Sequence, residues 1–184
     1  DPAVGERAAR DNSQDIEDVL TGADMVFVTA GEGGGTGTGG APIVAGIARG
    51  LGALTVAVVT KPFSFEGKRR ADNAEHGIEK LRDACDTLIT IPNDRLLQQE
   101  DKTISINEAF SKADEVLFNG VQGITDLIST PGLINVDFAD VKSVLADSGA
   151  ALMGIGRASG NDRASKATDL SLIHISEPTR PERI

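Results

Sequence analysis

The chain has 184 residues, with 18 Lys and Arg against 28 Asp and Glu, which gives a formal net charge of −10. Such an acidic chain, whose dense basic cluster is limited to residues 68–70 and whose aromatic residues are all Phe, is not expected to bind nucleic acid. No apolar run reaches the length of a membrane span, so membrane insertion is not expected either. A lone cysteine, Cys85, excludes an internal disulfide and favours a cytoplasmic location.

A glycine-rich segment is the most informative local feature. Seven of the ten residues 31–40 are glycine. The preceding residues 25–30 are apolar and β-branched, as in a buried parallel strand, and residues 41–48 carry Pro42 near the start of a helical pattern. A glycine loop between a strand and a helix exposes backbone N–H groups at the positive end of a helix dipole. The flanks therefore favour an anion-binding loop over a flexible linker.

The residues that follow this loop limit the class of phosphate ligand that it can bind. A P-loop requires a lysine directly after the glycines, and this chain has none there. Gly35, Gly37 and Gly40 satisfy the G-x-G-x-x-G dinucleotide pattern, but the next strand, residues 54–60, ends without the carboxylate that binds the ribose of NAD. Lys61 follows this strand, so an NADP-binding Rossmann oxidoreductase domain stays open as an alternative.

The remaining pattern alternates strands and helices, which predicts a mostly parallel sheet covered by helices. A charged amphipathic helix is expected over residues 69–85 and a third strand over residues 87–91, with Cys85 packed in the core between them. A long amphipathic helix then begins near Ile104 and ends before Pro131.

Two carboxylates precede a further short helix expected over residues 141–145. Asp137 and Asp140 are three residues apart, a spacing that suits helix capping. The same pair could polarise a water molecule. From the residues alone, capping is favoured over catalysis.

Several of these segments together carry a family resemblance. The loop at residues 31–40 resembles the signature of the tubulin superfamily, and residues 1–167 are similar throughout to the bacterial cell-division GTPases of the FtsZ family. Three further segments support the resemblance at the expected separations: residues 58–70, 89–94 and 135–140.

The resemblance implies an α/β fold, a partial Rossmann-like GTPase domain with a mostly parallel sheet, a long core helix and the start of a second domain. Residues 1–104 would form the partial nucleotide-binding domain with three strands, and residues 105–130 the connecting core helix. Residues 131–170 would form the catalytic loop and the start of the C-terminal domain. Residues 171–184 do not resemble the family and are interpreted as a non-native tail.

The family resemblance also implies a function and a set of site residues. It implies GTP or GDP as ligand with Mg²⁺, hydrolysis, head-to-tail assembly into filaments of the division ring, and other division proteins bound through a C-terminal tail that this chain lacks. Catalysis would use Asn135, Asp137 and Asp140 in a neighbouring subunit. The residues expected to bind nucleotide are Gly33, Gly34, Gly35, Thr36, Gly37, Thr38, Glu66, Arg70, Asn93, Phe110 and Asp114, with Asn93 and Asp114 on the guanine edge and Phe110 stacked on the base.

One departure from the family concerns the loop itself. Glu32 stands where the family usually carries Met. If its side chain points inward, its charge is expected to weaken phosphate binding. An assembly module that binds nucleotide without hydrolysis is the second alternative to the GTPase interpretation.

Overall fold

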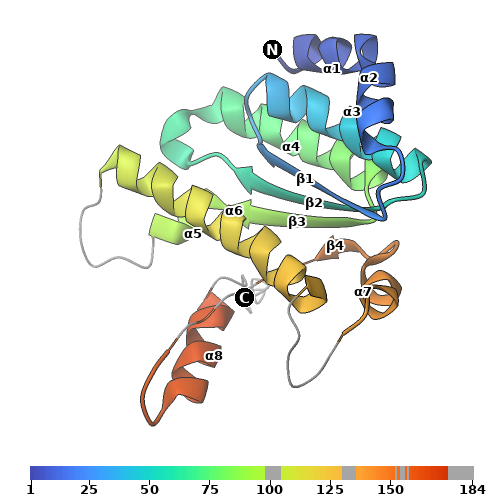
Figure 1. Cartoon of the computed structure of the whole chain (residues 1–184). Helices are drawn as coiled ribbons and strands as arrows, with labels where there is room; N and C mark the ends of the chain where they lie inside the picture. The colour runs from blue at the N-terminus through green and yellow to red at the C-terminus, as the bar shows by residue number, and fades with distance from the viewer. Residues whose placement is uncertain (98–104, 130–135, 152, 154–155, 157, 174–184) are drawn as a thin grey trace, which may run out of the picture. The chain divides into compact units, whose positions relative to one another are not determined.

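A computed structural model describes residues 1–97, 105–129, 136–151, 153, 156 and 158–173 of the chain. The chain divides into two compact units, residues 1–151 and residues 152–184. The first unit contains a sheet with helices on both faces (Figure 1). In the second unit, one helix is described, α8 (Arg163–Ile173).

The sheet has four parallel strands in the order β1-β2-β3-β4. They are β1 (Met25–Gly31), β2 (Leu54–Lys61), β3 (Thr87–Pro92) and β4 (Gly149–Ala151). Every residue of β2 except the last is buried, as expected for a central strand rich in Val and covered on both faces. The parallel sheet and the three longer strands confirm the expectation from the sequence.

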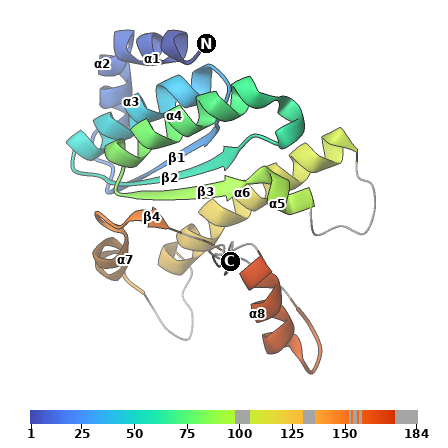
Figure 2. The ribbon, with the colours of Figure 1, turned by 180° about the vertical axis from the view of Figure 1, so that it is seen from behind.

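The helices lie on two sides of this sheet. Helices α3 (Thr36–Gly50) and α4 (Lys68–Ala84) connect β1 to β2 and β2 to β3 and cover one face. The long helix α6 (Ile106–Ser129) crosses the other face, as the view from behind also shows (Figure 2). The shorter elements are α1 (Pro2–Asp11), α2 (Ser13–Leu20), η1 (Ser64–Glu66), α5 (Asn93–Leu97) and α7 (Phe138–Leu145).

The main core lies between the sheet and helices α3 and α4. It is built from small and branched aliphatic side chains, in keeping with the shortage of aromatic residues. Cys85 belongs to this core, with 4% of its surface exposed, and burial raises the pKa of its thiol to about 11. The expectation of a structural cysteine is therefore confirmed.

The three strands expected within residues 1–104 are present, and a fourth strand that was not expected, β4, pairs with the start of β3. Its three residues Gly-Ala-Ala have neither β-branched side chains nor alternating polarity, so they carry no strand signal. Tertiary contacts hold the preceding turn instead: Thr87 Oγ1 donates to the Leu145 carbonyl at 2.5 Å. Arg49 also pairs with Asp147 in this turn, at 2.5 Å.

The start of the long helix is stabilised by hydrogen bonds between residues that are close in sequence. Ser105 N–H donates to Glu108 at 2.7 Å, and Glu108 N–H donates to Ser105 Oγ at 3.3 Å, so the two residues form a reciprocal capping box. Among the helices that the structure describes, none combines the length and the apolar character that a bilayer crossing requires.

Candidate functional site

The glycine loop lies at the carboxyl end of β1, where α3 begins at Thr36. Gly33 adopts φ +99°, and a β-carbon on it would lie 2.7 Å from the Arg70 carbonyl oxygen of α4, so both the backbone angle and the close approach require glycine. Gly33 N–H donates to Thr38 Oγ1 at 2.8 Å, and Asn73 Nδ2 donates to the Gly33 carbonyl at 3.4 Å. The loop is thereby held against α4.

The N–H groups that follow lack an acceptor among the described residues. Residues 34–38 have no acceptor for their backbone N–H groups among the described residues, because they form the end of the loop and the first turn of α3. Five consecutive donors at a helix N-terminus form an anion-binding surface. Gly33 and Thr38 differ from the other expected site residues. The Gly33 N–H and the Thr38 hydroxyl bond to each other, and this bond positions the loop.

The connection after β2 brings a second expected pair together. Glu66 Oε2 pairs with Arg70 at 2.5 Å, while Glu66 Oε1 accepts from Phe63 N–H at 2.9 Å. Asp94, at the end of β3, accepts from Ser64 N–H at 2.9 Å. The sequence reasoning did not name Asp94 and Asn73 as site residues. Asp94 ties the start of α5 to Ser64, and Asn73 of α4 ties that helix to Gly33. Asp94 follows the end of β3 by two residues, whereas Asn73 lies within α4 and carried no local signal.

Asn93 lies in a setting that suits a binding residue. Its side chain is 4% exposed, and its Oδ1 atom has no hydrogen-bond partner among the described residues. It borders a cavity of about 250 Å³ together with Lys61, Phe63 and Glu75. A buried acceptor without a partner costs about 1–3 kcal/mol. A ligand that donates a hydrogen bond to Asn93 would remove that cost.

Phe110 and Asp114 are on α6, one helical turn apart, which places them on the same side of the helix. Phe110 is 39% exposed and makes edge contacts with Phe63 and Phe65, whose rings stack at 4.9 Å. Asp114 is exposed. The structure thus places Phe110 against Phe63, which follows β2 and lines the Asn93 cavity. The Phe110 ring is only partly covered.

Asp137 and Asp140 cap α7, as the residues alone favoured. Asp140 N–H donates to Asp137 Oδ1 at 2.9 Å, and Asp137 N–H donates to Asp140 Oδ2 at 3.3 Å. Both residues are exposed. The end of α7 lies beside the start of β3, through the bond from Thr87 to Leu145, whereas the glycine loop follows the carboxyl end of β1, so α7 and the loop lie toward opposite ends of the strands. Asn135, the third expected catalytic residue, lies outside the described residues.

Glu32 points into the molecule. Its side chain is 4% exposed, and neither carboxylate oxygen has a hydrogen-bond partner among the described residues. A β-carbon on Gly77 of α4 would lie 2.5 Å from Glu32 Oε2 and 2.5 Å from Thr38 Cγ2, so the carboxylate packs directly against this glycine and a side chain there would have to displace one of them. Burial raises the pKa of Glu32 to about 7.

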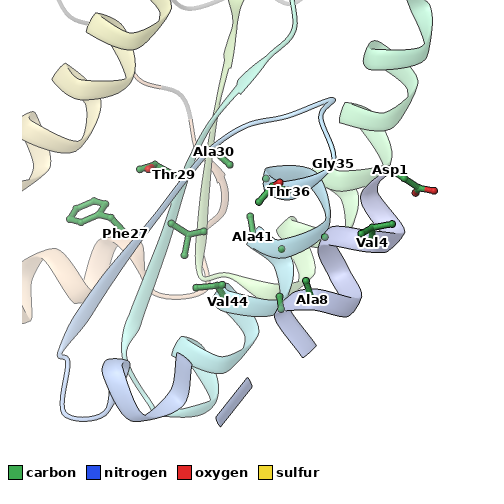
Figure 3. Close-up of a pocket in the computed structure, with 15 residues that line it drawn as sticks. Asp1, Val4, Ala8, Phe27, Thr29, Ala30, Gly35, Thr36, Ala41 and Val44 are labelled. Carbon is green, nitrogen blue, oxygen red and sulfur yellow. The ribbon is translucent and has the colours of Figure 1, made fainter. Parts of the chain in front are cut away.

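A pocket of about 780 Å³ lies beside the loop, between α1, α3 and β1 (Figure 3). Helix α1 closes one side because glycines allow it near the loop: a β-carbon on Gly5 or Gly39 would collide with the facing backbone. The lining is mostly small or apolar, and it follows the edge of β1 that has no partner strand among the described residues. This pocket is suited to a polypeptide segment more than to phosphate.

Comparisons with known proteins identify the family. The family model described as "Tubulin/FtsZ family, GTPase domain" matches residues 1–101, more than half of the chain. An FtsZ dimer from M. jannaschii, described as empty, matches with a TM-score of 0.90 and 49% identity, over 94% of this chain and 50% of that one. A mutant FtsZ of the same organism matches with a TM-score of 0.90 and 48% identity, over 95% and 52%.

A more distant structure shares the fold alone: CetZ1 from Haloferax volcanii, described as a GDP-bound monomer, with a TM-score of 0.66 and 23% identity, over 87% of this chain and 47% of that one. The chain spans about half the length of each of these structures. The family model matches more than half of the chain, and the chain belongs to the tubulin/FtsZ family.

Proposed function

We propose that this chain binds GTP and GDP through the glycine loop, as the nucleotide-binding part of a self-assembling GTPase. The observation that carries the proposal is the row of unpaired N–H groups at residues 34–38, at the carboxyl end of a parallel sheet. Phosphate oxygens would accept from these donors at the positive end of α3. CetZ1, which shares the fold, is described as GDP bound.

The guanine base would lie toward Asn93 and α6. The unpartnered Oδ1 of Asn93 offers an acceptor, and the Asp114 carboxylate offers another to the N1–H and amino group of guanine. Adenine lacks that donor pair and would leave the acceptors unpaired, which is a strong basis for discrimination. The exposed part of the Phe110 ring would pack on the base, and the Glu66–Arg70 pair would lie toward the ribose and phosphates.

Hydrolysis would require a second subunit. Asp137 and Asp140 are at the opposite end of the sheet from the loop, so a single chain cannot bring them to the γ-phosphate of its own nucleotide. A head-to-tail neighbour would present them to the loop, where α7 holds both carboxylates in place to orient the attacking water. M. jannaschii FtsZ is described as a dimer, which supports self-association in this family. We further propose that the assembled subunits form filaments of the cytoplasmic division ring.

Magnesium would enter with the nucleotide. In phosphoryl-transfer sites Mg²⁺ is held by substrate phosphates and one or two carboxylates. Within the described ranges, no group of three or more His, Cys, Asp or Glu side chains is arranged to hold a metal ion. The chain's own contribution would then be limited to orienting the phosphates that carry the ion.

The NADP alternative depended on Lys61 as the cation for a 2′-phosphate. Lys61 pairs with Glu75 at 2.6 Å, so its charge is already engaged. Competition between GTP and NADPH for the chain, followed with a fluorescent guanine nucleotide, decides between the two ligands. GTP is expected to displace the probe and NADPH is not. Displacement by NADPH alone would refute the proposal.

The role of the glycine loop in phosphate binding can be tested with a substitution that introduces no steric clash. A β-carbon at Gly34 meets no atom within 4 Å, so Gly34→Asp is expected to fold and to place a carboxylate among the phosphate donors. Gly46→Asp is the matched control, because Gly46 on α3 has equal space away from the loop. GTP binding should be lost in the first variant and kept in the second. Equal binding by both would refute the assignment of the loop.

Hydrolysis by neighbouring subunits is tested by mixing two inactive variants of the intact protein. Gly34→Asp keeps Asp140 but lacks a working loop, and Asp140→Asn keeps the loop but lacks the carboxylate. In a head-to-tail assembly some sites join the intact loop of one variant to the intact Asp140 of the other. Phosphate release should therefore appear only on mixing. If Asp140→Asn alone is as active as wild type and mixing adds no activity, the result would favour an assembly module that does not use this residue.

A further inference from the structure

Glu32 is the buried charged residue closest to the phosphate donors, and the proposed chemistry does not use it. It is adjacent in sequence to Gly33, and its carboxylate lies against Thr38 of α3 and Gly77 of α4. The same Thr38 hydroxyl receives the N–H of Gly33, so the residues that surround Glu32 are also those that shape the loop. The Glu32 carboxylate and the glycine loop therefore both contact the first turn of α3.

Among the described residues, the surrounding elements offer Glu32 no counter-ion. Strand β2 presents the Thr60 carbonyl, which accepts from Glu32 N–H at 2.9 Å, and α3 presents Thr38. Helix α4 presents Gly77 and the amide of Asn73. The charged groups of the neighbouring turns are paired elsewhere, in the ion pairs Arg70–Glu66, Lys61–Glu75 and Lys80–Glu6. Burial therefore governs the ionisation of Glu32.

We propose that Glu32 takes up a proton when the loop binds its phosphate ligand, so that this chain binds nucleotide with the Glu32 carboxyl neutral. The inference rests on the proposed binding of nucleotide at the loop. The proton comes from solvent and adds to a carboxylate oxygen of Glu32, and no other bond changes. A bound phosphate chain and an ionised Glu32 would both be anions at the positive end of α3, and the buried setting screens their repulsion weakly.

This coupling has a definite direction. Nucleotide binding favours the neutral form of Glu32, and by linkage the neutral form favours nucleotide binding. Affinity for nucleotide should fall as pH rises through the range in which Glu32 ionises, near pH 7. If the bound anion raises the pKa of Glu32 by one unit, affinity changes about tenfold between the two limits. A methionine at this position could not couple binding to pH.

The test compares GDP affinity from pH 6 to pH 8.5 for the wild-type chain, Glu32→Gln and Glu32→Met, with Glu79→Gln as a control that removes an exposed charge of α4. Titration calorimetry in PIPES and in Tris, whose ionisation enthalpies differ, counts the protons taken up. The Glu32→Gln profile isolates the titration of GDP itself, and circular dichroism verifies that each variant is folded.

We expect the wild-type chain and Glu79→Gln to lose about tenfold more affinity across this range than either Glu32 variant, and to take up a fraction of a proton that both Glu32 variants lack. The same pH profile and the same proton uptake in Glu32→Gln as in wild type would overturn the inference while leaving nucleotide binding established. No GDP binding at any pH by wild type and both Glu32 variants would overturn the proposed function, and the inference with it.

Discussion

Replacing Glu32 by Gln should change how stability depends on pH, even without nucleotide. Glu32 has an ordinary pKa of 4.5 when the chain is unfolded, and burial raises this pKa to about 7 in the folded chain. One pKa unit is worth about 1.4 kcal/mol, so the folded state loses about 3 kcal/mol of stability through this residue as pH rises. That stability is fully present below pH 4.5 and is lost as pH rises through 7. Glutamine has nearly the same shape and does not titrate.

Urea unfolding at pH 5 and pH 8, for wild type, Glu32→Gln and the exposed control Glu79→Gln, measures this difference directly. The free energy of unfolding of Glu32→Gln relative to wild type should be higher at pH 8 than at pH 5, by an amount approaching 3 kcal/mol. The control should follow wild type. A difference between Glu32→Gln and wild type that stays constant from pH 5 to pH 8 would show that Glu32 is not held neutral by burial, and the reasoning would fail.

Three further changes test the packing around the loop and the sheet edge. Gly77→Ala brings a β-carbon within 2.5 Å of Glu32 Oε2 and should cost about 1–3 kcal/mol in urea unfolding, whereas Gly123→Ala meets open space and should not destabilise. Thr38→Val leaves the buried Gly33 N–H without an acceptor and should cost about 1–3 kcal/mol, with slower nucleotide capture in stopped flow. Thr29→Lys adds a charge to the edge of β1 that has no partner strand among the described residues and should lower self-association in sedimentation velocity.

The local elements of the fold were predictable because their signals are local. The apolar run before the glycines, the helical spacing after them and the Asp137–Asp140 box each depend on neighbours within about four residues, and the structure shows a strand, a helix and a capped helix there. Strand β4 was not predictable, since its pairing with β3 depends on a partner distant in sequence.

The candidate site was predictable in its parts and not in its arrangement. The glycine loop is recognisable from composition, yet only the packed structure shows that Gly33 and Thr38 bond to each other and that residues 34–38 keep free donors. Sequence spacing likewise says nothing of the distance between Asp140 and the loop. The sheet separates them, because one lies near the start of the strands and the other at their carboxyl ends.

The sequence by itself determined the family, the parallel α/β fold and the presence of an anion-binding loop, because periodicity, glycine clustering and helix caps are recorded in adjacent residues. Only the tertiary structure decided the state of Glu32. Its charge is evident from the sequence, but its burial depends on Gly77, which is 45 residues away and leaves the space for its carboxylate. Desolvation is a property of packing, and packing joins residues that the sequence keeps apart.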